Sequence, residues 1–469
     1  MHSLKHVHSP SYKMDMCHGP MLGKIIRYAL PVMLTGILQL LFNAADLVVV
    51  GQFCGSRSVA AVGATGALIG LMVNLFMGLS VGAGVNVAVN VGANDDKAAH
   101  ETVHTAIPTA LISGLLLSAI GICFSRQFLK WMGTPEDVID LSSLYMRIYF
   151  CGMTQSMLYN YGAAILRAVG DTRRPLIFLT VAGVLNVLLN LLFVTAFKMD
   201  VAGVALATAI SQTLSAVLVL AALVRRDDCC RLIPGKMLIR KKPLLRIIAV
   251  GLPAGIQGSL FGISNVIIQS SVNSFGSVVL SGSSAAGNVE SFVYISMNAF
   301  HHAGMNFVGQ NDGARLYKRI GRIRLICLGC VTVIGIVMGW TIFFFARPLL
   351  SIYLADSPEA IEYGVIRMAY ICLPYCLNGL HDVMTGIIRG MGRSTGPMLI
   401  SVFGICVTRI VWVSTIFRLP AFHNMQFLFM TYPISWLITF ALLTVCYEII
   451  MRRLRRRGDE ELETAAAFG

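Results

Sequence analysis

Charged residues are scarce in this chain of 469 residues. Asp, Glu, Lys and Arg together make up 13% of it, about half of the roughly 25% that soluble domains carry. Hydrophobic residues make up 56%, and the mean hydropathy is +0.73. A soluble chain of this length would form about three domains with charged surfaces. The composition excludes that arrangement and predicts an outer surface that faces lipid.

Motifs of known catalytic machinery are also missing. The chain has no GxxxxGK[ST] segment and no HExxH or GxSxG segment, so it carries neither an ATPase engine nor a recognisable hydrolase centre. Cys327 and Cys330 have CxxC spacing, but they stand in an apolar run, where Cys acts as a small apolar residue. We therefore expect a protein that is not an enzyme and binds no cofactor.

The charge that is present is unbalanced, with 37 Lys and Arg against 23 Asp and Glu. In a soluble protein such an excess would suggest nucleic acid binding. Here the basic residues stand in short clusters between apolar runs, which is typical of cytoplasmic loops that obey the positive-inside rule. We therefore expect the lipid bilayer, and not nucleic acid, as the partner of this chain.

Twelve apolar stretches are each long enough to cross the bilayer as a helix. The fold class is thus an all-α polytopic membrane protein. The stretches cover residues 25–50, 58–85, 101–124, 142–166, 175–197, 202–224, 244–270, 277–305, 321–345, 360–388, 396–417 and 425–450. Glycines four residues apart allow close helix contact in lipid, and three such pairs are Gly78 and Gly82, Gly251 and Gly255, and Gly258 and Gly262.

The basic clusters orient these spans. With twelve spans, the linker 225–243, the Arg-rich segment 452–457 and the pair Arg173 and Arg174 all fall on one side, whereas the loops 51–57 and 418–424 of the other side hold one Arg each. The positive-inside rule places the basic side and both termini in the cytoplasm of a cell bounded by a bacterial inner membrane. The expected organisation is a cytoplasmic tail 1–22, an N-lobe 23–224, the linker 225–243, a C-lobe 244–450 and a cytoplasmic tail 451–469.

The tail before the first span is polar. It has no apolar core of a signal peptide, so we interpret it as a cytoplasmic segment without fixed structure. A metal site is the alternative, built from His2, His6, His8, Cys17 and His18.

The second half of the chain repeats the first. Four landmarks recur at offsets between 217 and 224 residues, which predicts two six-helix bundles of the same membrane orientation. Parallel repeats of this kind suit alternating access around a central site. The pairs are Leu30-Pro31 with Leu252-Pro253, Val91 to Asp95 with Val308 to Asp312, Leu166 to Pro175 with Ile388 to Pro397, and Ile210-Ser211 with Ile434-Ser435.

Taken together, the motifs resemble those of the multidrug and toxic compound extrusion family. They are Ala29 to Pro31, Phe42 to Asp46 with Val50-Gly51, Leu166 to Thr172, Leu185 to Asn190, and Ala202 to Gln212, and the resemblance covers about residues 22–450. It implies a V-shaped pair of lobes that works as a monomer. It also implies export of small amphipathic, often cationic molecules against entry of Na⁺ or H⁺.

An ionisable group at membrane depth is expensive and is a functional candidate by default. Asp46 lies in the outer half of the first span, and Asn186 and Asn190 share one face of the fifth. With Thr208 they would offer the oxygen ligands that a hard cation such as Na⁺ prefers, and the resemblance implies that these positions meet in an N-lobe cation site. Some family members have Asp where this chain has Asn190, so a relay between paired carboxylates is less expected here than binding of Na⁺. Helix packing is the plain alternative for all four.

The predicted C-lobe also holds ionisable groups within its spans. Glu290 would carry a proton or attract a cationic substrate. Asp382 of the tenth span would take part in ion coupling or form a gating salt bridge, and the resemblance places the coupling acid of that span nearer Asn378 than Asp382. Arg409 stays charged, so we expect it to form a structural charge pair with one of these two acids.

Met and aromatic side chains would line the substrate cavity, because Met surfaces adapt to varied ligands and aromatic faces bind cations. The candidates are Gln39, Phe42, Tyr149, Met153, Phe292 and Met297, with Met33, Met72, Phe76, Phe261 and Tyr375 as further positions. A flippase for a lipid-linked precursor is the alternative function. It would need a strongly basic cavity, and Arg409 and Arg147 are the main basic residues expected within the spans.

Overall fold

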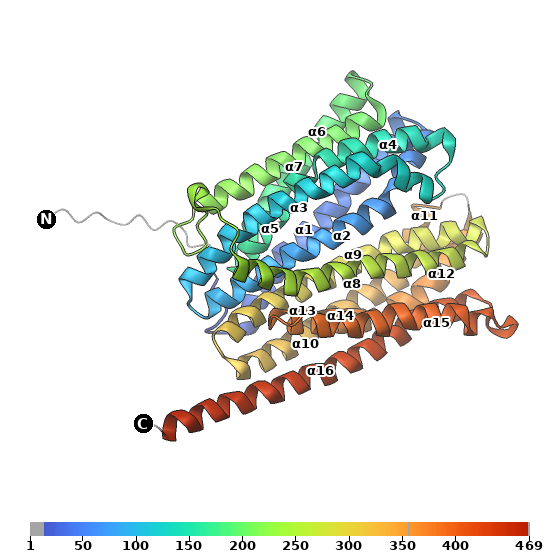
Figure 1. Ribbon diagram of the computed structural model, residues 1–469. Coiled ribbons are helices and arrows are strands. Elements are labelled where there is room, and N and C mark those ends of the chain that lie inside the picture. The colour runs from blue at the N-terminus through green and yellow to red at the C-terminus, as the bar shows by residue number, and fades with distance from the viewer. Residues whose placement is uncertain (1–13, 355–356, 468–469) are drawn as a thin grey trace.

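The computed structural model describes residues 14–354 and 357–467, and nearly all of these residues are helical (Figure 1). The first half contains α1 (Met21–Phe53), α2 (Ser56–Gly92), α3 (Asp96–Trp131), α4 (Glu136–Cys151), α5 (Met153–Ala168), α6 (Arg173–Leu191), η1 (Leu192–Ala196) and α7 (Asp200–Val224). The linker contains η2 (Pro234–Lys236). The second half contains α8 (Lys241–Asn273), α9 (Ser277–Gly313), α10 (Tyr317–Phe344), α11 (Ala346–Ser351), α12 (Pro358–Cys372), α13 (Tyr375–Gly390), α14 (Thr395–Ser401), η3 (Val402–Val407), α15 (Thr408–Ser414), η4 (Ile416–Arg418), η5 (Pro420–Phe422) and α16 (Met425–Ala467).

Each predicted span coincides with one helix or with consecutive helices. In the described part of the chain nine helical segments are long and apolar enough to cross a membrane, and α12 with α13, bent by 46°, makes a tenth. The remaining two spans are the broken pair α4 and α5 and the long helix α9. Most residues in the second half of α9 are buried within the protein, which explains why a helix of 37 residues carries polar side chains at membrane depth.

The two halves repeat each other in backbone detail. The helices α1 and α8 have 33 residues each, and α2 and α9 have 37 residues each. A π-helical segment interrupts the fifth span of each half, at η1 and at η3. Left-handed residues also recur in register: Gly55 with Gly276, Asn94 with Arg315, and Gly170 with Gly392. The internal repeat that the sequence predicts is therefore confirmed.

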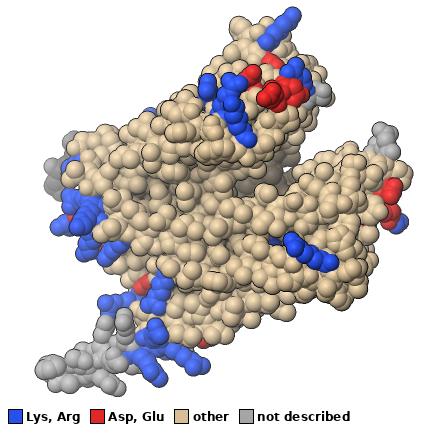
Figure 2. Space-filling view, turned by 45° about the vertical axis from the view of Figure 1, so that its right-hand side comes forward, with Lys and Arg blue, Asp and Glu red and all other residues tan. Residues whose placement is uncertain are grey.

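The helices form a V. One arm contains α1 to α7 and the other contains α8 to α16 (Figure 1). Figure 2 shows Lys and Arg side chains with few acids beside them at one end of the molecule. At the other end it shows a cleft between the two arms, and the tip of one arm there carries Lys and Arg beside Asp and Glu. We call the end that carries the linker 225–243 and the start of α6 the basic end, and the end with the cleft the open end.

Glycines bring the two arms into backbone contact at α2 and α8. A Cβ atom on Gly78 would lie 2.2 Å from the backbone nitrogen of Gly255, and one on Gly82 would lie 2.2 Å from the carbonyl oxygen of Ile247. A Cβ atom on Gly251 would lie 2.6 Å from the Cα atom of Leu79. The close contact predicted from the spacing of these glycines is therefore confirmed, and it leaves no room for any side chain at this point of the junction. The same prediction is wrong for Gly262, where no atom lies within 4 Å of the Cβ position, because the arms have diverged there.

The basic end is closed by a second contact between the arms, where α2 and α9 end. A Cβ atom on Gly313 would lie 1.9 Å from the carbonyl oxygen of Val89. Gln310 of α9 donates a hydrogen bond of 2.7 Å to the carbonyl oxygen of Ala168 at the end of α5. Nearby, Asn306 donates a hydrogen bond of 2.8 Å to the hydroxyl group of Tyr28 on α1. These polar contacts hold the lobes together at this end, and Ser259 of α8 adds a hydrogen bond of 3.1 Å to the carbonyl oxygen of Leu71 farther along α2.

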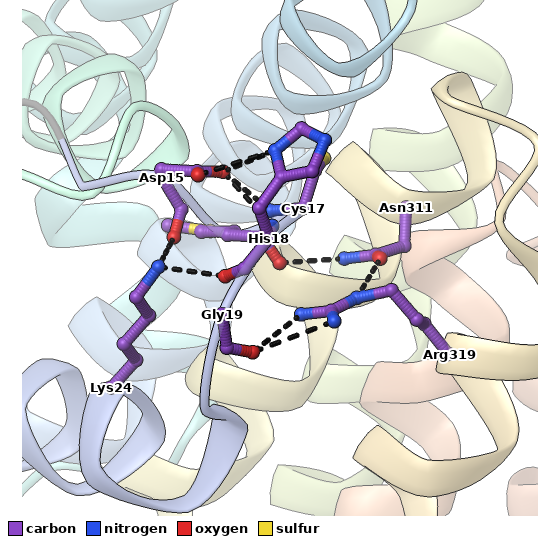
Figure 3. Close-up of polar contacts among 8 residues, drawn as sticks. Asp15, Cys17, His18, Gly19, Lys24, Asn311 and Arg319 are labelled. Atoms are coloured by element: carbon purple, nitrogen blue, oxygen red, sulfur yellow. Dashed lines mark hydrogen bonds and ion pairs between the residues drawn. The ribbon is translucent and has the colours of Figure 1, made fainter.

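The segment before α1 is part of the same closure (Figure 3). The backbone nitrogen of Met14 donates to the carbonyl oxygen of Val169 in the N-lobe, at 3.2 Å. On the C-lobe side, Asn311 donates to the carbonyl oxygen of Met16 at 3.0 Å, and Arg319 donates to that of Gly19. Met16 is completely buried. The expectation of a tail without fixed structure over residues 1–22 is therefore wrong from residue 14 onward, because these residues bind both lobes.

The N-terminal His residues, the end of α16 and the linker complete the description of the predicted tails and linker. His2, His6 and His8 lie outside the described residues, and His18 contacts Asp15 at 3.2 Å. At the other terminus α16 continues beyond the predicted span boundary at residue 450 and ends at Ala467. The linker 225–243 is anchored to the N-lobe, where Arg240 pairs with Glu101 at 2.6 Å and the backbone nitrogen of Ile233 donates to the ring of His104 at 3.0 Å.

Candidate ion and substrate sites

Four side chains predicted to form an ion site meet between α1, α6 and α7. Asn190 donates a hydrogen bond of 2.5 Å to a carboxylate oxygen of Asp46 and another, of 3.3 Å, to the side-chain oxygen of Asn186. Asn186 in turn donates to the hydroxyl oxygen of Thr208 at 3.3 Å. Asn186 and Asn190 lie four residues apart on one face of α6, which is why both reach the same point. The chain thus places all four residues in one connected cluster.

The chemistry of this cluster is that of an oxygen site. Asn190 is completely buried, and its side-chain oxygen accepts no hydrogen bond from any described residue. A buried acceptor without a donor is costly, and a cation or a bound proton removes that cost. One carboxylate together with neutral amide and hydroxyl oxygens is a suitable ligand set for Na⁺ and an acceptable proton site.

A second polar region lies in the C-lobe. It is a cavity of about 630 Å³, within the range of small-molecule sites. Its walls come from α8, α9, α12, α13, η3, α15 and α16, and Asn74 of α2 contributes from the other arm. The lining contains the predicted residues Glu290, Asp382, Arg409, Phe261 and Tyr375.

Glu290 pairs with Arg367, not with Arg409. Its two carboxylate oxygens accept hydrogen bonds of 3.0 and 2.8 Å from the guanidinium of Arg367, in a two-pronged geometry, and both side chains are nearly buried. Arg367 is a site residue missing from the predicted set, although it lies within the tenth predicted span. It carries the same signal as Arg409, a charge at membrane depth.

Asp382 is held by a different set of groups. Its carboxylate lies 3.0 Å from the ring of His301 and accepts a hydrogen bond of 2.9 Å from Asn298. Both partners are on α9, so this contact joins α13 to α9. Beside it, Asn378 and His381 contact each other at 2.9 Å. The structure thus brings Asp382 and Asn378 into one polar cluster that lines the cavity.

The charge pair expected for Arg409 is absent among the described residues. Its guanidinium donates only to neutral oxygens, at 3.3 Å to Asn265 and at 3.4 Å to Ser435, and it stacks over the ring of Tyr432 at 4.1 Å. The prediction is wrong because Arg367 and His301 already bind the two acids. Spacing along the sequence does not show which of several cations reaches a carboxylate first.

The predicted substrate-lining residues are dispersed. Met153 and Met297 are each 1% exposed and belong to the packed cores of their lobes, so neither faces a cavity in this conformation. Tyr149 packs beside Tyr145 and Phe150, and Phe42 fills the space above Gly183 of α6. Gln39 is exposed and Phe292 is half-buried. None of these six residues lines the C-lobe cavity.

Comparison with known proteins finds the same family model in both halves of the chain, as the internal repeat predicts. A family model described as MatE matches the chain twice, over residues 31–192 and 253–413. The probable multidrug resistance protein YpnP of Bacillus subtilis is 27% identical over 397 residues, which cover 84% of this chain and 88% of YpnP. The probable multidrug resistance protein YoeA of the same organism is 27% identical over 437 residues, 91% of this chain and 93% of YoeA. A solved structure of a MATE in complex with MaL6 superposes with a TM-score of 0.87 at 20% identity, over 94% of this chain and 98% of that one.

Proposed function

Because the chain belongs to the multidrug and toxic compound extrusion family, we propose that it is a secondary active exporter driven by entry of Na⁺ or H⁺. Its substrates are amphipathic, often cationic organic compounds. The family consists of membrane transporters and not of enzymes, which agrees with the missing catalytic motifs. The names of YpnP and YoeA, both probable multidrug resistance proteins, support the same substrate class for this chain.

The protein acts as a monomer in the bacterial inner membrane, with both termini in the cytoplasm. The charge distribution supports this orientation, because Lys and Arg gather at the basic end (Figure 2) and the positive-inside rule places such an end in the cytoplasm. The described conformation is then closed toward the cytoplasm and open toward the outside. In that state a bound compound would leave and a coupling ion would enter.

The observation that carries the proposal is the cluster of Asp46, Asn186, Asn190 and Thr208. In the described state the amide nitrogen of Asn190 faces Asp46. Rotation of this amide by half a turn would present its unpartnered oxygen beside the carboxylate and create a site for Na⁺. A proton on Asp46 is the alternative, and after the same rotation the protonated carboxyl group would donate a hydrogen bond to the amide oxygen of Asn190. Both ions neutralise the only carboxylate in the cluster.

Ion binding at Asp46 would act on the closure at the basic end through α1. This helix carries Asp46 in its outer half and Tyr28 near the basic end, where Tyr28 accepts the hydrogen bond from Asn306 of the other lobe. Neutralising Asp46 alters the contacts among α1, α6 and α7, and a tilt of α1 would loosen the closure at the basic end. An ion shifts the two states only if its affinity differs between them. Each charge that crosses the membrane supplies about 2.3 kcal/mol per 100 mV.

The flippase alternative has less support. It needs a strongly basic cavity that holds a pyrophosphate. In the described cavity Glu290 neutralises Arg367, and Asp382 adds a second acid. The named relatives are probable multidrug resistance proteins, which also favours the exporter.

Ethidium efflux from proteoliposomes tests the proposal, with Na⁺ and pH gradients imposed separately. We expect one gradient to drive the wild-type protein and Asp46→Asn to abolish transport. Asp140→Asn is the matched control, since Asp140 is an exposed acid that pairs with Arg126 at the surface, and this variant should transport normally. Gradient-driven efflux that survives Asp46→Asn would refute coupling at this site. Failure of both gradients to move ethidium would refute the drug-export proposal.

A further inference from the structure

The C-lobe cavity contains a cation, Arg409, that pairs with no acid among the described residues. We propose that Arg409 binds an anionic group of the substrate, so that this cavity accepts aromatic amphiphiles that carry a carboxylate. The inference rests on the proposed function, because it takes the cavity as a substrate site. It goes beyond that function by assigning an anion subsite to a transporter whose expected substrates are mostly cationic.

The other charges of the cavity are already paired. Arg367 meets both carboxylate oxygens of Glu290, at 3.0 and 2.8 Å, and Asp382 is bound by His301 and by Asn298. The pair of Arg367 and Glu290 carries no net charge, and the carboxylate of Asp382 is engaged by two side chains of α9 and not by Arg409. Arg409, in contrast, has only neutral acceptors among the described residues, at distances of 3.3 and 3.4 Å. Among the described lining residues, Arg409 is therefore the guanidinium group without a carboxylate partner.

Burial makes this available charge significant. Arg409 is 5% exposed and still lines the cavity. Arg does not lose its proton in proteins, and a buried charge without a counter-ion is unfavourable. A carboxylate from a ligand would relieve that cost. The planar guanidinium would meet it with two parallel hydrogen bonds, the geometry in which Arg recognises carboxylates.

The surrounding backbone leaves space for such a group. Arg409 lies two residues after the end of η3, a π-helical segment, and π-helical turns are frequent at functional sites. On α8, which faces it, Gly262 has no atom within 4 Å of the place where a Cβ atom would stand. The amide side chains of Asn265 and Gln269 line the same stretch of α8. They would hold the remaining lone pairs of a carboxylate.

An aromatic wall adjoins the guanidinium. Trp436 packs against Tyr375 and Tyr432, with ring centroids 5.5 and 5.7 Å apart, and Arg409 lies over the ring of Tyr432 at 4.1 Å. All three rings line the cavity. A flat aromatic ligand would stack on this wall while its acidic group reaches Arg409. The preferred ligand thus combines an aromatic ring system with a carboxylate.

Two dyes with the same ring system isolate the carboxylate. Rhodamine 110 carries a free carboxylate, and rhodamine 123 is its methyl ester. Binding of each dye is measured by fluorescence anisotropy on the purified full-length protein in phosphatidylcholine nanodiscs, without any ion gradient. We expect the wild-type protein to bind rhodamine 110 more tightly than its ester. Equal or weaker binding of rhodamine 110 overturns the proposal, and this comparison needs no variant.

Variants then assign the preference to Arg409. Arg409→Gln should weaken binding of rhodamine 110 by about tenfold or more, as expected for a charged hydrogen bond, and leave rhodamine 123 unchanged. The affinity of Arg409→Lys for rhodamine 110 should lie between those of the wild-type protein and Arg409→Gln, because Lys keeps the charge but loses the two-pronged geometry. Arg347→Gln is the matched control, since Arg347 is exposed and pairs with Glu362 at 3.1 Å. An equal loss of both dyes in Arg409→Gln would show a structural role and overturn the proposal.

The phosphate of a lipid headgroup could also supply the anion. One further measurement distinguishes a lipid phosphate from a substrate carboxylate. Adding phosphatidylglycerol to the nanodiscs should leave the affinity for rhodamine 110 unchanged. A strong fall would show that lipid headgroups occupy the subsite instead. Because none of these measurements uses a gradient, their outcome is independent of ion coupling. Ethidium efflux without any preference between the dyes would reject this inference alone. A dye preference without efflux under either gradient would reject the proposed drug export and leave the anion subsite standing.

Discussion

Asn311 of α9 donates a hydrogen bond of 3.0 Å to the backbone carbonyl of Met16, and so binds the segment before α1 to the far lobe. The same segment binds the near lobe through Met14 and Val169. Figure 3 shows Arg319 beside this contact, where it donates both to Asn311 and to Gly19. This segment contacts both lobes at the closed end. It must therefore lose its contacts with one lobe when that end opens.

Weakening this contact should expose Cys17, which lies within the segment and is half-buried. Asn311→Ala removes the bond to Met16 and the acceptor of Arg319, so we expect alkylation of Cys17 by N-ethylmaleimide to become several-fold faster. Mass spectrometry of the Cys17 peptide measures the rate. Asn273→Ala, an exposed Asn at the open end of α8, serves as control and should not change it. An unchanged rate in Asn311→Ala would contradict the closure by this segment.

The pH dependence of the same reaction distinguishes Cys17 from Cys229 in the linker. Burial raises the pKa of Cys17, whereas the hydrogen bond with Cys230 lowers the pKa of Cys229. The thiolate is the reactive form, so a raised pKa moves the rise in rate to higher pH. We expect Cys229 to reach its full alkylation rate at lower pH than Cys17. The reverse order in peptide-resolved rate profiles would contradict these environments.

The pair of Glu290 and Arg367 predicts a compensating double substitution. Glu290→Gln leaves a buried guanidinium without its counter-charge, which should cost about 3–5 kcal/mol of stability. Adding Arg367→Gln removes that uncompensated charge, so the double variant should recover most of the melting temperature in detergent. Ethidium efflux then separates the roles of Glu290. Recovered stability with recovered efflux indicates a structural pair, whereas recovered stability without efflux shows that Glu290 takes part in transport.

The junction of α2 and α8 should not tolerate even a methyl group. Gly78→Ala would place a Cβ atom 2.2 Å from the backbone nitrogen of Gly255, and overpacking of this kind costs about 1–3 kcal/mol. We expect a lower melting temperature and reduced efflux. Gly70→Ala on the same helix is the control, because no atom lies within 4 Å of that Cβ position. Equal melting temperatures for the two variants would refute the tight junction.

A second carboxylate in the N-lobe cluster should change the coupling ion. Asn190→Asp would place two carboxylates at hydrogen-bond distance, since Asn190 contacts Asp46 directly. Two such groups cannot both ionise at low cost, so one retains a proton at neutral pH. We expect efflux by this variant to depend more strongly on a pH gradient and less on Na⁺ than wild-type efflux. An unaltered response to both gradients would show that Asn190 is not part of the coupling site.

Local properties of the sequence were sufficient to predict the fold class, the spans and part of the N-lobe site. Hydropathy, span length and the basic clusters predict the helical class and the spans, because lipid requires each segment to satisfy its own backbone hydrogen bonds. The spacing of Gly78 and Gly82 indicates close contact without naming the partner, since only small residues permit that contact. The placement of Asn186 and Asn190 on one helix face also follows from the sequence, because it depends only on the helical period.

Only the tertiary structure decided which distant groups meet. Arg367 and Arg409 are both cations within C-lobe spans. The packing of α12 against α9 places Arg367 beside Glu290, whereas Arg409 contacts neutral partners. The segment before α1 reads as a free polar tail, but it lies between the lobes because Asn311, 295 residues away, binds its backbone. Hydropathy reports the preference of each residue for lipid or water, and that preference is local. Pairing of charges depends on distances that exist only once the helices have packed.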